Sequence, residues 1–127
     1  MAAIDAALDG APLIAPGCAV DLVGIAGTVT TLAAIHLALA EYDADRVHGA
    51  LLTREQVDAV VARLGRSTQA ERLSLPGLDP KRADVIFAGG SIAARVMARG
   101  RFPSLVTSDR GIRWGLAYEI AEAAGAP

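Results

Sequence analysis

The stretch from Val20 to Leu39 constrains the fold of this chain most, because its pattern changes from strand to helix within a few residues. Residues Ala19–Gly24 predict a buried strand, and the loop Gly24–Gly27 follows it directly. Apolar residues at helical spacing then predict a helix from Thr28 to about Ala40. A strand, a glycine loop and a helix in this order indicate an α/β domain.

The start of this predicted helix is a candidate phosphate site. The first N–H groups of a helix lack intrahelical partners, and the helix dipole favours an anion there. Gly27 lets a ligand approach the backbone closely, and the hydroxyls of Thr28 and Thr30 add hydrogen-bond donors. We therefore predict that these three residues bind phosphate. The same pattern occurs at ordinary strand-to-helix turns, so the local motif leaves a purely structural role open.

Length and composition limit the classes of protein to which this chain can belong. Its 127 residues fit one domain, and a hydrophobic share of 53% is enough to bury a core. The sequence has no run of about 18 apolar residues and no basic signal-peptide region, so we expect a cytoplasmic protein without a membrane span. The single cysteine excludes an internal disulfide, and the net charge of −2 argues against binding nucleic acid by broad electrostatic attraction.

The rest of the sequence predicts a narrow sheet flanked by helices. Capping boxes, in which a threonine pairs with a glutamine or glutamate, predict helices that begin after Thr53 and Thr68. The other expected elements are helices over Met1–Leu8, Ser91–Arg99 and Ile112 to about Ala124, one helical turn from Pro80, and strands over Val85–Ala88 and Ser104–Thr107. Strands that alternate with helices imply parallel strands joined by crossover helices. We therefore expect an α/β fold with a short parallel sheet, part of which lies outside this chain.

Two further turns are expected at the edge of the sheet that carries Gly27, because ligands of open α/β sheets bind beyond the carboxyl ends of the strands. Gly89-Gly90 follows the second predicted strand, and Ser108-Asp109 follows the third. Asp109 could orient a water molecule or a metal ion, and Arg113 could bind a phosphate oxygen. The structural alternatives are that the glycines only allow close packing of a helix on a strand, and that Asp109 only caps the last helix.

His48 and the aromatic residues of the last helix complete the candidate positions. His48 lies beside Gly49 in a predicted loop, where it could hydrogen-bond a ligand or close a turn. Trp114 and Tyr118 are one helical turn apart and predict packing against a neighbouring element. No cysteines or histidines have metal-ligand spacing, and no nucleophile stands with an evident base, so the residues alone predict neither a metal site nor a catalytic residue.

Several blocks of the sequence, in the same order, resemble one protein family. The blocks are Gly24–Leu32 (GIAGTVTTL), Val47–Gly49 (VHG), Glu71-Arg72 with Leu75–Leu78 (LPGL), Arg82–Gly90 (RADVIFAGG) and Ser108–Gly115 (SDRGIRWG). Over about Ala19 to Ile120, the chain resembles the C-terminal part of the exopolyphosphatase / guanosine pentaphosphate phosphatase (Ppx/GppA) family. The resemblance implies a partial ribonuclease H-like domain of the actin-like ATPase superfamily.

This resemblance also implies a reaction and a set of site residues. Members of the family release terminal phosphate from inorganic polyphosphate, or the 5′ phosphate from guanosine pentaphosphate, with water and a divalent cation, usually Mg²⁺. The resemblance places Gly27, Thr28 and Thr30 on the phosphate cleft. It places Gly89-Gly90 where nucleotide-binding relatives hold a nucleoside, and Ser108, Asp109 and Arg113 near the cleft between two domains.

The chain departs from the family pattern in two ways. Ala26 and Val29 stand where the family loop usually has glycine and alanine, which narrows the approach to the loop. The N-terminal domain with its catalytic glutamate, and the hairpin that opens the second domain, have no counterpart in the sequence. We therefore expect a C-terminal fragment of a two-domain phosphatase, inactive alone, whose partners are that N-terminal domain and, through an exposed truncation surface, a second copy of the chain. A non-catalytic module that binds polyphosphate or a nucleotide, and a structural role with a vestigial cleft, are the alternatives.

Overall fold

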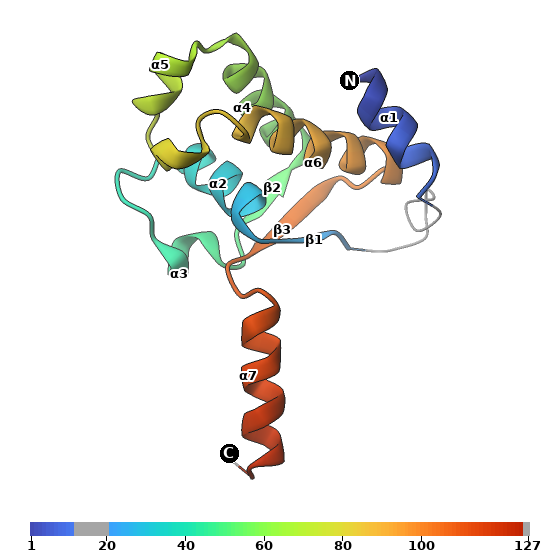
Figure 1. Cartoon of the computed structure of the whole chain (residues 1–127), viewed down its shortest axis with the longest axis vertical. Helices are drawn as coiled ribbons and strands as arrows, with labels where there is room; N and C mark the ends of the chain where they lie inside the picture. The colour runs from blue at the N-terminus through green and yellow to red at the C-terminus, as the bar shows by residue number, and fades with distance from the viewer. Residues whose placement is uncertain (12–20, 126–127) are drawn as a thin grey trace.

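A three-stranded mixed sheet lies at the centre of the computed structural model, which describes residues 1–11 and 21–125 (Figure 1). The strands are β1 (Val23–Ile25), β2 (Leu51–Thr53) and β3 (Ser104–Ser108), in the order β1-β3-β2. β1 runs parallel to β3, whereas β2 pairs with β3 in the antiparallel direction. The α/β class is confirmed, but the prediction of a wholly parallel sheet is wrong because it missed β2. Part of the predicted strand Ala19–Gly24 lies outside the described residues.

Most of the predicted helices are present. The capping boxes at Thr53 and Thr68 are confirmed, since each threonine accepts a backbone N–H and its partner side chain returns the bond. Asp79 likewise caps a short 3₁₀ turn, by accepting from the backbone N–H of Lys81 at 3.0 Å. The helical elements are α1 (Ala2–Asp9), α2 (Gly27–His36), α3 (Ala44–Val47), α4 (Arg54–Arg66), α5 (Gln69–Leu73), η2 (Pro80–Arg82), α6 (Ile86–Gly100) and α7 (Ile112–Ala123).

The predicted strand Val85–Ala88 is wrong, because this stretch forms the start of α6. A short apolar run fits a buried strand and a buried helix equally well, and the packing decides between them. Gly90 lies inside α6, where an added Cβ would lie 3.1 Å from Val61 Cγ2 and 3.2 Å from Leu32 Cδ2. The missing side chain therefore lets α6 approach α4 and α2 closely, and Gly89-Gly90 is not a turn after a strand.

Helix α2 lies at the centre of the core. Every residue from Val29 to Ile35 is buried, and the helix packs against β1, β3, α3, α4 and α6. The core around it includes Leu52 from β2, Leu64 from α4 and Met97 from α6. A helix that is apolar on all its faces is stable in water only when it is surrounded in this way.

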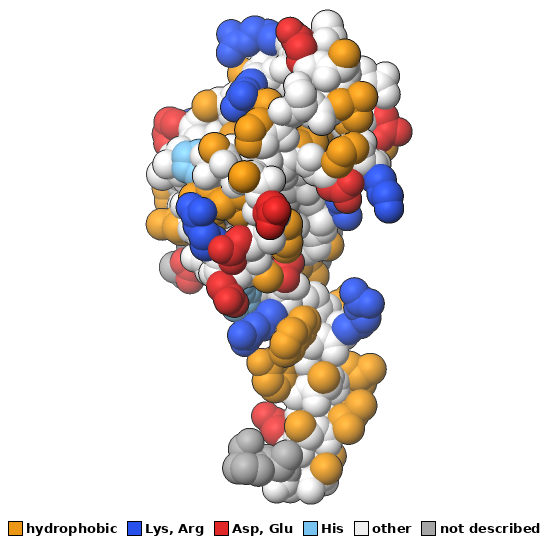
Figure 2. Space-filling model, turned by 90° about the vertical axis from the view of Figure 1, so that its left-hand side faces the viewer, with side chains coloured by type: hydrophobic (Ala, Val, Ile, Leu, Met, Phe, Trp, Pro, Cys, Tyr) orange, Lys and Arg blue, Asp and Glu red, His pale blue; other side chains and the backbone are white. Residues whose placement is uncertain are grey.

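Helix α7 differs from the others because it projects away from the rest of the protein (Figure 1). Ile112 is 82% exposed and Ile120 is 61% exposed, and hydrophobic side chains are spread over the helix (Figure 2). The rings of Trp114 and Tyr118 face each other at 6.0 Å, but within the described chain no neighbouring element covers them. Among the described residues, no helix is long and apolar enough to cross a membrane.

Gly77 holds the segment between α5 and η2 against α2. It has a φ of +83°, and an added Cβ would lie 2.3 Å from the carbonyl carbon and oxygen of Ala34. Both the backbone conformation and the close approach to a neighbouring backbone require glycine. Because this segment forms one wall of the site described below, its position depends on this contact.

We expect Gly77→Ala to lower the free energy of unfolding by about 3 kcal/mol, since a left-handed alanine and a methyl group forced against backbone both destabilise the fold. Gly49→Ala is the matched control, because Gly49 has a similar φ of +77° but no atom within 4 Å of an added Cβ. It should cost only about 1 kcal/mol. Urea denaturation measures both values, and equal costs would show that the contact with Ala34 contributes nothing.

Candidate functional site

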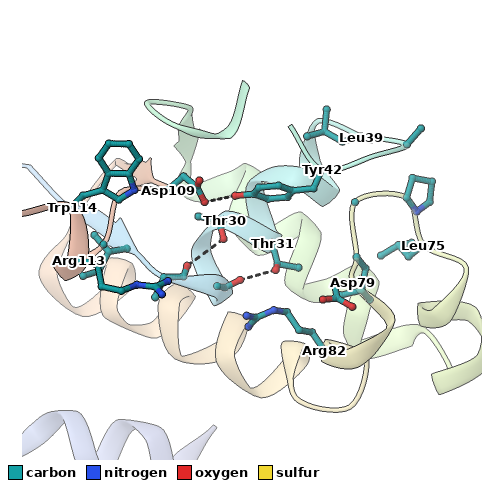
Figure 3. Close-up of a pocket in the computed structure, with 18 of the residues that line it drawn as sticks. Thr30, Thr31, Leu39, Tyr42, Leu75, Asp79, Arg82, Asp109, Arg113 and Trp114 are labelled. Carbon is teal, nitrogen blue, oxygen red and sulfur yellow. Dashed lines mark hydrogen bonds between the residues drawn. The ribbon is translucent and has the colours of Figure 1, made fainter. Parts of the chain in front are cut away.

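A hollow of about 1340 Å³ opens at the N-terminus of α2 (Figure 3). Its floor is the end of β1 and the first turns of α2. One side is formed by the segment after α2, which includes Leu39 and Tyr42, and by residues 73–79 together with Arg82. The other side is formed by Asp109 and the first turns of α7. The hollow therefore lies at the sheet edge where the sequence placed the ligand.

The first turn of α2 has unoccupied hydrogen-bond donors. Its N-cap residue, Ala26, makes no side-chain cap, so within the described chain the first N–H groups of the helix have no capping acceptor. Ala26 has a φ of +69°, a value that favours glycine. The resemblance expects glycine at this position, and the alanine keeps the loop conformation at some cost in backbone strain.

The three residues predicted to bind phosphate divide into two groups. Gly27 and Thr30 line the hollow, together with Thr31, which the sequence analysis did not select. Thr28 faces α6 instead, since an added Cβ on Gly89 would lie 2.9 Å from its hydroxyl oxygen. The hydroxyl of Thr31 donates to the carbonyl of Gly27 at 2.6 Å, and that of Thr30 to the carbonyl of Ala26 at 3.3 Å. The donors left for a ligand are therefore mainly backbone N–H groups.

Two arginines face this helix start. An added Cβ on Gly27 would lie 2.2 Å from Arg82 Nη2, so the Arg82 guanidinium lies directly over Gly27. Arg113 extends from the first turn of α7, and Figure 3 shows both side chains pointing toward the start of α2. In the part of the chain that the structure describes, neither guanidinium forms an ion pair with a carboxylate. Two positive charges and a helix N-terminus together favour an anion with several negative oxygens.

Sequence reasoning found Arg113 but missed Arg82. The only signal for Arg82 was its place at the head of the block Arg82–Gly90, which was selected for its glycines. The direction of the Arg82 side chain depends on its contact with Gly27. Gly27 lies far from Arg82 in the sequence, so the local pattern around Arg82 does not reveal this contact.

The carboxylates of the hollow already have partners. The Asp79 side chain accepts from the backbone N–H of Lys81, and Asp109 Oδ1 accepts the Tyr42 phenol proton at 2.5 Å. Asp109 does not cap α7, because the N-cap is Gly111 and it makes no side-chain bond. The structural alternative, in which Asp109 only caps the last helix, is therefore wrong.

Tyr42 has an altered acidity. Burial, the hydrogen bond to Asp109 and the charge of that carboxylate raise the pKa of the phenol to about 12, and a contact with the Thr30 hydroxyl opposes them. Because Tyr42 is 54% exposed, we give the bond to Asp109 more weight than the burial. The phenol is therefore neutral at physiological pH and acts as the donor in this bond.

The remaining predicted residues lie away from the lining. The Ser108 hydroxyl lies 3.4 Å from His48 Nδ1 and bonds the backbone of Arg110, so both residues stand beside the hollow and do not line it. Gly89 and Gly90 lie in the interface of α6 with α2 and α4. The cleft predicted from these residues is thus built in part from Asp109 and Arg113, with Gly89 and Gly90 serving helix packing.

The donor set does not fit a resident magnesium ion. Over residues 1–11 and 21–125, no three His, Cys, Asp or Glu side chains lie together as a metal site requires. Mg²⁺ prefers oxygen ligands, and the two carboxylates of the hollow already accept hydrogen bonds. We therefore derive no step through a metal from the described residues.

Comparison with known proteins identifies relatives of this chain. A model of the Ppx/GppA phosphatase family matches residues 13–124. Exopolyphosphatase 2 of Mycobacterium tuberculosis is 35% identical over 104 residues, which cover 78% of this chain and 32% of that protein. The chain thus spans about a third of the length of the curated exopolyphosphatases that it matches.

Solved structures show the same relationship. The crystal structure of an exopolyphosphatase-like protein is 31% identical and superposes with a TM-score of 0.84, over 98% of this chain and 41% of that one. The Aquifex aeolicus member of the Ppx/GppA family is 29% identical with a TM-score of 0.78, over 85% of this chain and 36% of that one. These likenesses confirm the fold class that the sequence predicted.

We expect the phenol of Tyr42 to titrate at a pKa of about 12, which the difference in phenolate absorbance between the wild type and Tyr42→Phe measures directly. Asp109→Asn keeps a hydrogen-bond acceptor but removes the negative charge, so it should lower this pKa toward the ordinary value of 10.0. A wild-type phenol that already titrates at the ordinary value would contradict the bond to Asp109.

Proposed function

Because the chain belongs to the Ppx/GppA phosphatase family, we propose that it supplies one wall of the phosphate cleft of an exopolyphosphatase-like hydrolase. The proposed substrate is inorganic polyphosphate, from which the complete enzyme releases terminal phosphate. The name of the Mycobacterium tuberculosis relative, exopolyphosphatase 2, supports this substrate class. The chain spans only about a third of that relative, so the activity is proposed for a complete enzyme and not for this chain alone.

One observation carries the proposal, namely the uncapped start of α2 facing Arg82 and Arg113. A terminal phosphate bears several negative oxygens, and backbone N–H groups at a helix start and guanidinium groups are donors that bind such oxygens. Arginine offers two parallel N–H donors to one phosphate, so two arginines can hold adjacent groups of a phosphate chain. The arrangement suits an anion with repeated phosphoryl groups.

The chain's contribution to the reaction is binding and orientation. In hydrolysis, water attacks the terminal phosphorus and the bond to the bridging oxygen breaks, while charge is spread over the transferring group. N–H groups and guanidinium groups fixed around that charge stabilise it without further reorganisation. The two carboxylates that line the hollow, Asp79 and Asp109, each accept a hydrogen bond from within the chain, which supports placing the catalytic glutamate in a complementary domain.

A metal ion belongs to this reaction in the family, whose phosphatases are generally metal-dependent. Mg²⁺ remains an expectation from the resemblance. When bound, a divalent cation would neutralise part of the substrate charge. The described residues do not make a metal site, so ligands for such a cation would come from the complementary domain and the substrate.

Guanosine pentaphosphate is the second candidate substrate, and the aromatic lining of the hollow favours it. Tyr42 and Trp114 both line the hollow (Figure 3). Aromatic rings stack on nucleobases, which would add affinity for a nucleoside at one end of a phosphate chain. Competition between guanosine pentaphosphate and tripolyphosphate for the chain distinguishes the two substrates.

Helix α7 supports a role for a complementary domain. Its exposed apolar residues include Trp114, Leu116 and Ile120, and a helix of this length is marginal in water without packing. We propose that the N-terminal domain of the complete protein covers α7, with a second copy of the chain as the alternative. We place the complete protein in the cytoplasm.

Binding of tripolyphosphate should depend on the two arginines. We expect Arg82→Ala and Arg113→Ala each to weaken binding by about tenfold or more, because each removes a charged hydrogen bond. Gly27→Ala should also weaken binding while leaving the fold intact, since its methyl group displaces the flexible end of Arg82. Titration calorimetry measures the affinities, and Arg66→Ala, on the exposed end of α4, is the control that should change nothing. Unchanged affinity in both arginine variants would refute the site.

We expect the isolated chain not to release phosphate from polyphosphate, because the proposal places the catalytic glutamate in the complementary domain. Adding a separately expressed N-terminal part of a two-domain relative should produce a complex, burying Trp114 and shifting its fluorescence to shorter wavelength. Phosphate release and size-exclusion chromatography measure the two effects. Release by the isolated chain at the rate of a two-domain relative would overturn the proposal, and a stable dimer of the chain alone would favour the second copy as the cover of α7.

A further inference from the structure

The hydrogen bond between Tyr42 and Asp109 joins two segments that are far apart in the sequence. Tyr42 lies in the segment after α2, and Asp109 lies between β3 and α7. The phenol donates to Asp109 Oδ1 at 2.5 Å. The bond therefore ties the hinge of α7, residues 109–111, to the segment between α2 and α3.

Helix α7 has little else to fix its direction. Its side chains mainly contact one another: Arg110 donates to the Tyr118 hydroxyl at 3.0 Å and lies 5.1 Å from the centre of the Trp114 ring. Both contacts turn with the helix as it moves. The hydroxyl of Ser108, the last residue of β3, bonds the backbone of Arg110 and lies 3.4 Å from Nδ1 of His48. In the described chain, the Tyr42–Asp109 bond is thus the side-chain hydrogen bond that links this hinge to the segment after α2.

Arg113 is the second residue of α7, four positions after Asp109, and lines the hollow. Its place opposite the start of α2 depends on the direction in which α7 leaves the hinge. Arg82 differs, because it is held from the body of the protein over Gly27. One of the two cationic side chains at the hollow therefore extends from the body of the protein, whereas the position of the other depends on the hinge.

We propose that Tyr42 is a positioning residue, which holds Asp109 and thereby keeps Arg113 directed at the start of α2. This inference rests on the proposed phosphate site. Tyr42 has one hydroxyl proton and gives it to Asp109, so it does not donate to the anion. The same bond offsets part of the negative charge of Asp109 at the rim of the anion site. The reduced negative charge also favours anion binding.

The direct test is the mobility of α7 in the absence of any anion. Trp114 is the only tryptophan of the chain, so its time-resolved fluorescence anisotropy reports on the first turn of α7 alone. Tyr42→Phe keeps the ring and removes the donor, and we expect it to increase the amplitude of fast Trp114 motion. Asp109→Ala should have the same effect, whereas Asp109→Asn should not, because its amide oxygen still accepts the phenol proton.

The second measurement is the affinity for tripolyphosphate. We expect Tyr42→Phe to weaken binding by about fivefold, as expected when one binding group loses its preorganisation. Asp109→Asn should not weaken it, since the bond stays and a negative charge is removed. Tyr118→Phe is the matched control, because it removes a phenol hydroxyl on α7 outside the hollow and should leave affinity unchanged.

The outcomes separate this inference from the proposed function. Faster Trp114 motion in Tyr42→Phe and Asp109→Ala, but not in Asp109→Asn, supports the positioning role. Unchanged motion in Tyr42→Phe overturns it, and so does weakened binding without a change in motion, because the phenol would then act on the anion directly. If the wild type does not bind tripolyphosphate, the proposed function fails, while the anisotropy series still decides whether Tyr42 holds α7. Circular dichroism of each variant confirms that the comparison is made on folded protein.

Discussion

The enclosure of α2 is the constraint on which the rest of this structure depends. All residues from Val29 to Ile35 are buried between the sheet, α4 and α6, so the helix cannot shift without opening the core. Its N-terminus faces the hollow that Arg82 and Arg113 line. The N–H groups of the first turn therefore keep their direction before any ligand arrives. A donor set that is fixed in advance binds an anion without the entropic cost of ordering it.

Glycines shape the hollow by removing side chains at contacts between elements. Gly27 makes room for the Arg82 guanidinium, Gly77 lets the wall segment rest on the backbone of α2, and Gly89 receives the side chain of Thr28. Of these three glycines, only Gly77 has a positive φ. Gly27 and Gly89 therefore allow a neighbouring side chain to come close and do not serve an unusual backbone conformation. The glycines of the sequence motifs are thus explained by distances between elements that no local pattern contains.

The features that the sequence predicted correctly are local, and those that it missed depend on distant contacts. Capping boxes at Thr53 and Thr68 involve residues three positions apart, so their pattern was sufficient. Strand β2 exists because it pairs with β3, and its three residues carry no strand signal of their own. The apolar run at Val85 was compatible with strand or helix until α2 and α4 were packed against it. Arg82 and Tyr42 were also missed because their roles depend on distant residues. Arg82 lies over Gly27, and Tyr42 bonds Asp109.

Helix α7 combines an exposed apolar surface with residues that line the hollow. The first turn carries Arg113 on the hollow, and the rest of the helix presents Leu116 and Ile120 to solvent. A partner that covers these side chains must lie beside the hollow and also restrict the movement of Arg113. Partner binding and anion binding then favour the same direction of α7. By linkage, each would strengthen the other by an equal factor, so that completing the cleft and filling it become coupled events.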